Sequence, residues 1–586
     1  MLGKRSHTCG ELRPVHDNND VILYGWVNKR RDHGGVIFID LRDRYGICQV
    51  VFDPGLDAKA HSLADSLRSE YVIAVQGRVR MRPESMINPK MITGEIEVIG
   101  FKLEILNKAE TPPFPIEDNI DVREDLRLKY RYLDLRRSEM QYSLILRNNV
   151  AQITRNHLNE IGFLEIETPF LIGSTPEGAR DFVVPSRLSK GKFYALPQSP
   201  QLFKQMLMVS GFDRYYQIVR CFRDEDLRAD RQPEFTQIDI EMSFIERDDV
   251  LSVVEGLVSD IFKQTLTIDI AAPFKKITYF EAMEHYGSDK PDLRYDMRIV
   301  DFSDLLEGSE FKVFQDTLLS KGVIRGIRID QYTNFSRKDM DGLVDFLKDF
   351  GARGLIPIKI MEQGFESPIK KFLNDDLFQR IQERADAKVG DTILLLADKK
   401  ETALKGLGAL RLKLADQLKI QPLTDYAIAW VVDFPLLEYS PEDKRWIACH
   451  HPFTSPTVSL EELRSVSPDQ IKAKAYDLVL NGNEIAGGSI RIHDQEMQKE
   501  MFHLLGIEEQ EAEEKFGFLL QSFRYGAPPH GGIAFGLDRL VMLLANRKSI
   551  RDVIAFPKTT AGYCQLTNSP SEIAVSQLVE LGIRLI

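Results

Sequence analysis

The chain has 586 residues, of which 43% are hydrophobic and 28% charged, an ordinary composition for a globular protein with sizeable cores. This length predicts roughly three or four domains. The five cysteines form no CxxC pair and no apolar stretch approaches ~20 residues, which argues against a zinc site, a disulfide framework and a membrane span. We therefore expect a cytoplasmic protein in a reducing compartment. The net charge of −12 does not exclude an RNA partner, because a local basic patch can bind phosphates on an acidic protein.

The first predicted domain is a small β-barrel over residues 1–108. Between Asn19 and Leu106, short alternating segments such as VILYGWV and ICQVVFD are separated by turns, and one helical stretch interrupts them at 58–69. Several short strands with one helix in about 90 residues are typical of an oligonucleotide-binding (OB) barrel. The basic run 29–31 adds local attraction for phosphates.

A linker is predicted over residues 109–143. It opens with the proline cluster 111–115 and continues with a basic stretch at 123–137. Two interpretations of the basic stretch stay open: a solvated helix, or an inter-domain hinge that touches RNA phosphates.

The remaining chain predicts an α+β domain interrupted by an insertion. Helices and strands alternate over 144–287, which we interpret as the first part of a catalytic domain. Residues 288–420 contain few polar clusters and are predicted to form an inserted α+β domain. A strand-rich pattern resumes over 421–586 and ends in a helix and tail.

A polar hairpin is predicted between Arg214 and Phe244. In its second half one face is apolar, formed by Ile238, Ile240, Met242 and Phe244. The opposite face holds Phe235, Gln237, Asp239 and Glu241. Since only one face can pack on a core, the polar face must look into solvent or a cleft. The connecting loop is crowded with charges, namely Arg223, Asp224, Glu225, Arg228 and Arg231. Several arginines beside an aromatic ring suit a nucleotide, although a plain solvated hairpin is the alternative.

A strand followed by a helix is predicted over 531–543. The apolar run meets Gly536, and Leu537, Leu540 and Leu543 then fall on one helical face. Arg539 lies in the first helical turn, where free backbone N–H groups favour an anion. A surface arginine on an amphipathic helix is the alternative.

A second hairpin is predicted over 477–493, with its turn at Asn481-Gly482. This turn pairs Glu484 with residue 479 and places Asp477 diagonally on the same face, an arrangement that suits a hard divalent cation bridging phosphates. Glu484 and Arg491 lie on opposite faces of a regular strand, so a bulge at Gly487-Gly488 is needed to bring them together. An ordinary cross-strand polar face is the alternative.

Together these segments resemble the three signature motifs of the class II aminoacyl-tRNA synthetases, and most closely the bacterial aspartyl enzymes. Residues 222–241 resemble motif 2, residues 536–540 resemble motif 3, and residues 162–171 resemble motif 1, which builds a dimer interface. The segments 175–187, 195–208 and 448–454 also match. The resemblance covers essentially the whole chain and implies an OB barrel, an antiparallel catalytic sheet with flanking helices, and an insertion.

The resemblance implies binding of ATP with magnesium. Arg223 would lie on the α-phosphate and the substrate carboxylate, and Phe235 and Arg539 would sandwich the adenine. The implied ATP-binding residues are Arg223, Asp224, Glu225, Arg231, Gln232, Phe235, Glu484, Gly536, Leu537, Asp538 and Arg539. Asp477 and Glu484 would hold the metal, and Arg223, Glu225 and Arg539 would be catalytic.

The resemblance also implies an aspartate site, formed by Glu177, Ser199, Gln201, Lys204, Arg223, Asp239, His450 and Arg491. Lys204 and Arg491 only donate hydrogen bonds, which suits a carboxylate. The amide of asparagine would turn donors toward donors, and losses of this type reach ~10⁴–10⁵. Without the resemblance, a solvated lysine and two isolated histidines would be the better interpretation of Lys204 and His450-His451.

In the barrel, Arg31, Phe38, Gln49 and Glu97 resemble the positions that read the anticodon. Taken alone, Phe38 is better interpreted as a core aromatic. His33 stands where tRNA(Asp)-specific enzymes carry leucine, and Ser85 stands where they carry lysine. We therefore predict that the protein charges tRNA(Asp) and also tRNA(Asn), with strict tRNA(Asp) specificity as the alternative.

Three further alternatives stay open: an asparaginyl enzyme, a lysyl enzyme, and an inactive RNA-binding relative. The pair Lys204 and Arg491 and the long insertion argue against the first two, and the presence of Arg223, Glu484 and Arg539 argues against the third. The expected partners are ATP, L-aspartate, tRNA and a second copy of the chain.

Overall fold

The computed structural model describes residues 2–175, 179–227 and 229–585. The chain divides into two compact units, each described by itself: Met1–Leu146 with Arg547–Glu572, and Arg147–Asn546 with Ile573–Ile586. From the sequence, residues 547–572 were assigned to the second catalytic segment, whereas the structure groups them with the N-terminal unit.

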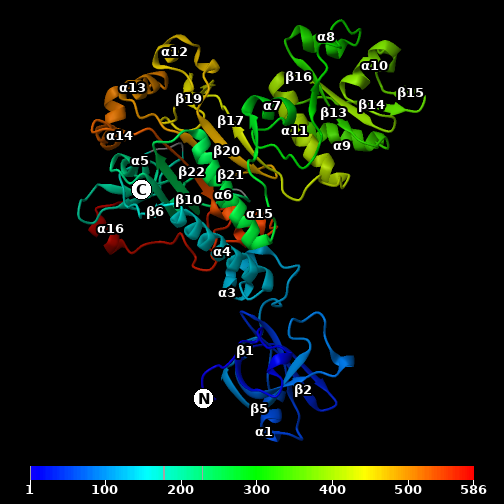
Figure 1. Cartoon of the computed structure of the whole chain (residues 1–586), viewed down its shortest axis with the longest axis vertical. Coiled ribbons are helices and arrows are strands. Elements are labelled where there is room, and N and C mark those ends of the chain that lie inside the picture. Colours follow the sequence, from blue (N-terminus) through cyan, green and yellow to red (C-terminus); the bar gives the residue numbers. More distant parts are fainter. Residues whose placement is uncertain (1, 176–178, 228, 586) are drawn as a thin grey trace. The chain divides into compact units, whose positions relative to one another are not determined.

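The N-terminal unit contains a closed five-stranded barrel in the order β1-β2-β3-β5-β4, which confirms the predicted OB fold (Figure 1). Its elements are β1 Asp20–His33, β2 Val36–Asp43, β3 Gly46–Phe52, α1 Ala58–Asp65, β4 Val72–Met81 and β5 Ile96–Asn107. Alternate side chains such as Leu23, Ile39 and Val50 fill the interior, as a period of two requires.

The basic stretch 123–137 forms the short helices α2 Glu124–Lys129 and α3 Arg131–Asp134, followed by the start of α4 Ser138–Glu160. Arg131 is only 2% exposed and donates hydrogen bonds to the carbonyl oxygens of Arg551, Ile554 and Ala555 and to the carboxylate of Asp134. The interpretation as a solvated helix is therefore wrong. At Arg131 the stretch is buried and connects two distant parts of the sequence, and the guanidinium of this residue forms its hydrogen bonds within the protein.

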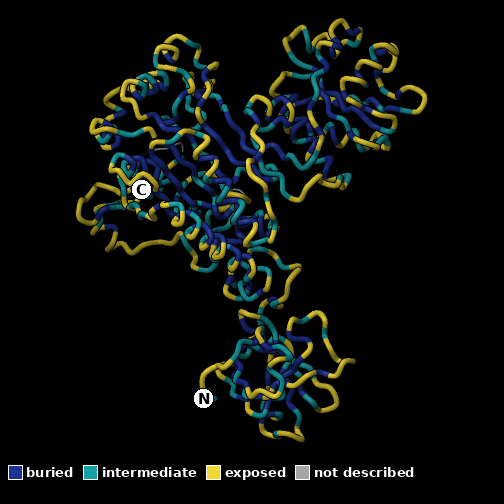
Figure 2. Tube along the Cα trace, viewed as in Figure 1, coloured by how far each residue is buried: buried dark blue, intermediate teal, exposed yellow. Residues whose placement is uncertain are grey.

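The second unit is built on an eight-stranded sheet in the order β11-β17-β20-β21-β22-β10-β9-β6. The strands are β6 Leu164–Glu165, β9 Arg214–Phe222, β10 Glu234–Ser243, β11 Lys275–Thr278, β17 Ile428–Val432, β20 Ala475–Leu480, β21 Asn483–Ile490 and β22 His530–Gly536. Neighbours are antiparallel except β11 with β17 and β6 with β9. In Figure 2 the strands of this sheet are mostly buried, whereas the surrounding loops are exposed.

Helices and two small hairpins surround the sheet. They are α5 Gln201–Val209, α6 Arg247–Leu266, α7 Tyr279–Tyr286, α12 Leu460–Ser465, α13 Gln495–Leu504, α14 Glu509–Phe523, α15 Leu537–Leu544 and α16 Val575–Leu581, with β7 Val183–Pro185, β8 Phe193–Ala195, β18 Leu437–Ser440 and β19 Arg445–Ala448. The indole of Trp430 in β17 donates to the carboxylate of Glu255 in α6 at 2.9 Å, which fixes this helix on the sheet.

One detail of the predicted hairpin is wrong. Phe244 was placed on the apolar face of β10, but the strand ends at Ser243. Phe244 has a φ of 58° and is 73% exposed, and its N–H donates to the carbonyl oxygen of Pro529. The chain turns here before α6 begins, so the alternation stops one residue early.

Between α7 and β17 lies a second sheet, in the order β12-β13-β16-β14-β15, with every neighbour antiparallel. Its elements are β12 Ile299–Asp301, α8 Lys312–Leu319, β13 Val323–Ile329, α9 Arg337–Lys348, β14 Ile356–Met361, β15 Gly364–Glu366, α10 Asp375–Arg384, β16 Thr392–Asp398 and α11 Lys400–Gln417. Both faces of β16 are buried. Leu394 and Leu396 pack into one core with residues of α9 and α11, and Ile393 and Leu395 into another with residues of α8 and α10. Within the described residues, no helix has the length and apolarity that crossing a membrane requires.

Candidate active site

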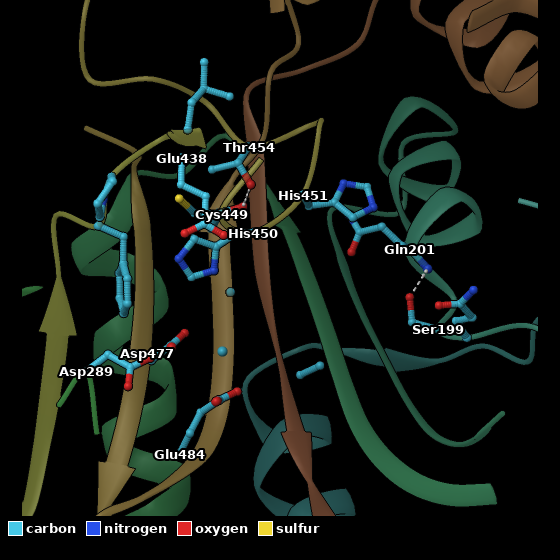
Figure 3. A pocket seen from close by; sticks show the side chains of 18 of the residues that line it. Ser199, Gln201, Asp289, Glu438, Cys449, His450, His451, Thr454, Asp477 and Glu484 are labelled. Atoms are coloured by element: carbon cyan, nitrogen blue, oxygen red, sulfur yellow. Dashed lines mark hydrogen bonds between the residues drawn. The ribbon is translucent and has the colours of Figure 1, made fainter. Parts of the chain in front are cut away.

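A cavity of about 960 Å³ opens in the second unit over the eight-stranded sheet. It is lined by side chains from β10, β20, β21 and α5, and by loops on either side of them. Figure 3 shows Asp289, Asp477 and Glu484 toward one side of this cavity and Ser199 and Gln201 toward the other. Ser199 and Glu484 are almost 300 positions apart in the sequence, so only the folded chain brings the strands of the sheet, α5 and the loops around one cavity.

One end of the cavity rests on four buried charges. The Nζ of Lys204 in α5 lies 2.6 Å from Oδ1 of Asp239 and 3.2 Å from Oε2 of Glu241, both in β10. The guanidinium of Arg491, which follows β21, donates to Glu241 at 3.0 and 3.2 Å. Burial alone would raise the pKa of Glu241, but Arg491 and Lys204 outweigh it and lower that pKa to about 2. Glu241 therefore stays ionised and holds both cations in place.

Glu241 is a positioning residue to which the sequence pattern gave no role. It is absent from the cavity lining and lies fully buried next to the two cations. The sequence does contain one indication of this role. Glu241 lies on the polar face of β10, two residues after Asp239, so the two acids share one face of the strand.

Several buried polar atoms of residues that line the cavity have no hydrogen-bond partner within the described residues: Nε2 of Gln201, Nε of Arg223, Oδ2 of Asp239 and Nε2 of both His450 and His451. Buried polar groups are normally paired, so donors and an acceptor left open around one cavity favour a small polar ligand. His451 joins this set although it is not among the predicted aspartate-binding residues. Of the eight predicted aspartate-binding residues, seven line the cavity, and Glu177 lies outside the described residues, as does Arg228 of the motif 2 loop.

The predicted ATP residues divide into two groups. Arg223, Glu225 and Glu484 line the cavity. The guanidinium of Arg223 lies 5.1 Å from the centroid of the Phe235 ring. The other predicted members, absent from the lining, are Asp224, Arg231, Gln232, Phe235, Gly536, Leu537, Asp538 and Arg539.

Two arginines of this second group are paired with acids. Arg231 lies 3.0 Å from the carboxylate of Glu225, and Arg539 lies 3.2 Å from Asp230 and also donates to the backbone oxygen of Glu484. The carboxylate of Asp538 is buried and accepts from the backbone N–H of Thr236 and from Arg147. Asp538 thus links α15 to β10 and α4 and does not line the cavity.

The acidic pair lies on the β20–β21 hairpin, with the predicted pairing of Val479 with Glu484. The predicted bulge is misplaced: the register shifts between Val479 and Leu478, so the extra residue is Ile485, and Gly487 pairs regularly with Asp477. A Cβ on Gly487 would lie 2.7 Å from Oδ1 of Asp477 and 3.4 Å from Oε1 of Glu484. The two carboxylates therefore converge over Gly487, and the absence of a side chain there leaves room for them.

The charges of this pair are unequal. Burial and the neighbouring Glu484 raise the pKa of Asp477 well above its ordinary value. Burial also acts on Glu484, but the ammonium of Lys290, 2.8 Å from its Oε2, outweighs it and lowers the pKa of Glu484. The described residues contain no cluster of three or more acidic, histidine or cysteine side chains with metal-ligand geometry. Two carboxylates fit magnesium, which commonly binds one or two protein carboxylates and completes its shell with phosphates and water.

The barrel carries a separate polar row. Arg31 donates to both oxygens of Asp40 at 2.7 Å and to Gln49 at 3.2 Å, and Gln49 donates to Glu97 at 3.0 Å. Phe38 is half-buried beside this row, opposite Arg31 in the β1–β2 ladder, and so is not a core aromatic. The four predicted anticodon residues thus lie together in one row, to which the structure adds Asp40; Arg31, Phe38 and Gln49 are partly exposed, whereas Asp40 and Glu97 are buried.

The two predicted specificity residues lie on exposed turns of the barrel. The His33 ring makes an edge contact with Phe38 at 6.0 Å, at the end of β1 and next to the polar row. Ser85 lies in the 3-10 helix Glu84–Met86.

Comparison with known proteins agrees with this architecture. A family model described as tRNA synthetases class II (D, K and N) matches residues 123–560, and one described as an OB-fold nucleic acid binding domain matches residues 21–106. The chain belongs to the class II tRNA synthetases. The match spans the residues of the eight-stranded sheet and of its cavity.

Two similar proteins, from Caldanaerobacter subterraneus subsp. tengcongensis and Oleidesulfovibrio alaskensis, are both named Aspartate--tRNA(Asp/Asn) ligase. They are 55% and 56% identical to this chain over 99% of its length, covering 98% and 95% of their own. Among solved structures, asparaginyl-tRNA synthetase from Pyrococcus horikoshii shares the fold with a TM-score of 0.60 and 21% identity, over 95% of this chain and 99% of that one.

Proposed function

We propose that the protein is a cytoplasmic aspartate–tRNA ligase that forms aspartyl-adenylate and diphosphate from L-aspartate and ATP. It then transfers the aspartate to the 3′-end of tRNA(Asp) and tRNA(Asn). The observation that carries this proposal is the buried pair of cations, Lys204 and Arg491, facing unpartnered polar atoms in the cavity of a class II synthetase. The names of the similar proteins support the same substrates.

Aspartate recognition follows from the hydrogen-bond capacity of the site. Arg491 has five N–H donors, of which three are used by Glu241 and Ser489, so donors remain for the side-chain carboxylate of the substrate. The unpartnered Oδ2 of Asp239 suits the substrate ammonium, and Nε of Arg223 suits its α-carboxylate. Asparagine would present an amide N–H₂ to donors, leaving buried groups unpaired.

The first step needs no protein base, because the α-carboxylate of aspartate is already ionised and attacks the α-phosphorus directly. Arg223 stabilises the charge that develops on the α-phosphate, and positioning supplies much of the remaining acceleration. Asp477 and Glu484 would hold magnesium, which supplies neutralisation of the phosphate charge. In the second step the 3′-hydroxyl of the terminal ribose attacks the carbonyl carbon of the anhydride, and AMP leaves.

Amino-acid activation is tested by pyrophosphate exchange. The full-length protein should exchange diphosphate into ATP with aspartate, and at least ~10³-fold less efficiently with asparagine or lysine. The variant Lys204→Gln should lose most of this activity, whereas Lys263→Gln, which changes an exposed lysine, should retain it. Exchange that depends on asparagine or lysine, or no exchange with any amino acid, would contradict the proposal.

The tRNA range is tested by charging purified transcripts. The wild type should aspartylate both tRNA(Asp) and tRNA(Asn). The double variant His33→Leu with Ser85→Lys should retain tRNA(Asp) charging and lose tRNA(Asn) charging by about tenfold or more. Both changes introduce the residues that tRNA(Asp)-specific enzymes carry at these positions, and His33 contacts Phe38 beside the polar row. Failure of the wild type to charge tRNA(Asn) would restrict the function to tRNA(Asp).

A further inference from the structure

Lys290 is a residue of the catalytic cavity that comes from the segment leading into the insertion. The segment leaves α7 at Gly287, and both Asp289 and Lys290 then line the cavity. The Nζ of Lys290 lies 2.8 Å from Oε2 of Glu484. No motif in the sequence analysis included this lysine.

The backbone that follows Lys290 is held firmly. Arg411 of α11 is almost completely buried and donates hydrogen bonds to the carbonyl oxygens of Asp292, Tyr295 and Met297 at 2.8–2.9 Å. On the other side, a Cβ on Gly482 of the β20–β21 turn would lie 3.1 Å from Cβ of Asp292. The segment therefore passes between the inserted domain and the hairpin that carries Asp477 and Glu484. The backbone next to Lys290 is thus held in place on both sides.

The charge pattern gives Lys290 a specific role. Three acids, Asp289, Asp477 and Glu484, line this end of the cavity, and Lys290 neutralises part of that charge without any metal. A divalent cation that binds Asp477 and Glu484 would take over the carboxylate that Lys290 uses. A partly buried ammonium without a partner is costly, and the flexible lysine stem allows it to reach another anion. The anion that arrives with the metal is the ATP triphosphate.

We propose that Lys290 is the resident counter-ion of the Asp477–Glu484 pair, competes with the divalent cation for it, and transfers to a phosphate oxygen of ATP when the cation binds. The competition between Lys290 and the cation concerns metal binding alone, whereas the transfer of Lys290 to ATP rests on the proposed function. One lysine is thus unfavourable for binding of the free metal and favourable for binding of ATP.

The test compares Lys290→Gln and Lys290→Arg with the wild-type full-length protein. Binding of Mn²⁺ without ATP, measured by electron paramagnetic resonance, should become roughly fivefold or more tighter in Lys290→Gln, because the competing charge is gone. In aspartate-dependent pyrophosphate exchange at saturating metal, the KM for ATP should rise about tenfold in the same variant while the KM for aspartate stays constant. Lys290→Arg should recover most of the ATP affinity.

The matched control is Lys276→Gln, since Lys276 has the same 40% side-chain exposure and pairs with Asp248 at 2.9 Å away from the cavity. This control should change neither affinity. A merely structural role for Lys290 would weaken both Mn²⁺ and ATP binding, and that result would overturn the proposal, as would Mn²⁺ binding that is unchanged or absent. Loss of exchange in the wild type would contradict the proposed function, whereas the Mn²⁺ comparison would still decide the counter-ion role.

Discussion

At the residue scale, the site depends on buried charges that neighbours of opposite sign compensate in the folded state: Lys204 and Arg491 lie against Asp239 and Glu241. Replacing Glu241 by Gln keeps the shape and removes one negative charge from beside two buried cations. We expect the free energy of unfolding to fall by about 3 kcal/mol, because breaking a buried ion pair leaves an uncompensated charge. Chemical denaturation at neutral pH measures this, with the exposed Glu401→Gln as control.

The same variant has a signature in pH. The pKa of Glu241 is about 2 when folded and near 4.5 when unfolded, so its contribution to stability is complete above 4.5 and disappears as the pH falls toward 2. Glu241→Gln should lose that part of the pH dependence. If the free energy of unfolding of Glu241→Gln fell between pH 4.5 and 2 as steeply as that of the wild type, the two cations would not stabilise the carboxylate.

His451 predicts a second pH effect over a different range. Burial, assisted by Arg491 and Lys204, lowers the pKa of His451 from 6.5 to about 3, so the folded protein keeps this ring neutral. The unfolded chain binds the proton below pH 6.5, and stability therefore falls as the pH drops from about 6.5 to about 3.

In His451→Gln, the free energy of unfolding should depend less on pH between about 6.5 and 3 than in the wild type. His503→Gln, which changes an exposed histidine, should leave this dependence unchanged. Equal slopes in the His451 variant and the wild type would contradict the neutral buried ring.

The absence of a side chain at Gly487 leaves room for the carboxylates of Asp477 and Glu484, and this can be tested. In Gly487→Ala the new methyl group would lie 2.7 Å from Oδ1 of Asp477, so the two carboxylates must separate. We expect pyrophosphate exchange to fall by about tenfold or more through loss of positioning, while the free energy of unfolding changes by no more than about 2 kcal/mol. Gly342→Ala in α9, where a Cβ meets nothing within 4 Å, should leave exchange unchanged. Full activity in the Gly487 variant would show that the carboxylates need not converge.

At the scale of the element, β1, β2, β3 and β5 contribute one polar residue each to a hydrogen-bonded row: Arg31, Asp40, Gln49 and Glu97. We predict that this row and Phe38 form the reading surface for the anticodon. Phe38 lies beside them with its ring half-exposed. Phe38→Ala should raise the KM for tRNA by about tenfold or more, since stacking of a base on an aromatic ring is worth about 1–3 kcal/mol.

Pyrophosphate exchange without tRNA should be unaffected by Phe38→Ala, because the barrel supplies none of the residues that line the catalytic cavity. Tyr45→Ala, on the exposed turn between β2 and β3, is the matched aromatic control. A KM for tRNA that does not change would remove Phe38 from the reading surface.

At the scale of the whole molecule, we propose a homodimer that uses the segment resembling motif 1. Leu164, Phe170 and Leu171 lie on this segment with 51%, 43% and 54% of their surface exposed, an arrangement that favours a protein partner. The double variant Phe170→Asp with Leu171→Asp should sediment as a monomer in analytical ultracentrifugation. Leu319→Asp, on an exposed position of α8, should leave the sedimentation of the wild type unchanged. A monomeric wild type would contradict this assembly.

The sequence alone determined the kinds of element, and its resemblance to a family predicted the chemistry of the site. Period-two alternation identified the barrel strands and the hairpin of β9 and β10, because the face that a strand side chain occupies depends only on its position in the strand. The Asn481-Gly482 turn likewise set the pairing of Val479 with Glu484. The aspartate site itself was predicted from the family resemblance, and the donor-only side chains of Lys204 and Arg491 suit the carboxylate that it implies.

Only the tertiary structure decided what depends on contacts between distant residues. The position of the bulge at Ile485, the burial of Arg131 among carbonyl groups some 420 residues away, and the place of Lys290 beside Glu484 all depend on such contacts. The buried position of Glu241 belongs with them, because a charge becomes a positioning group only when two cations from other elements surround it. Local pattern carries no record of these contacts, since they are made by packing between elements rather than within them.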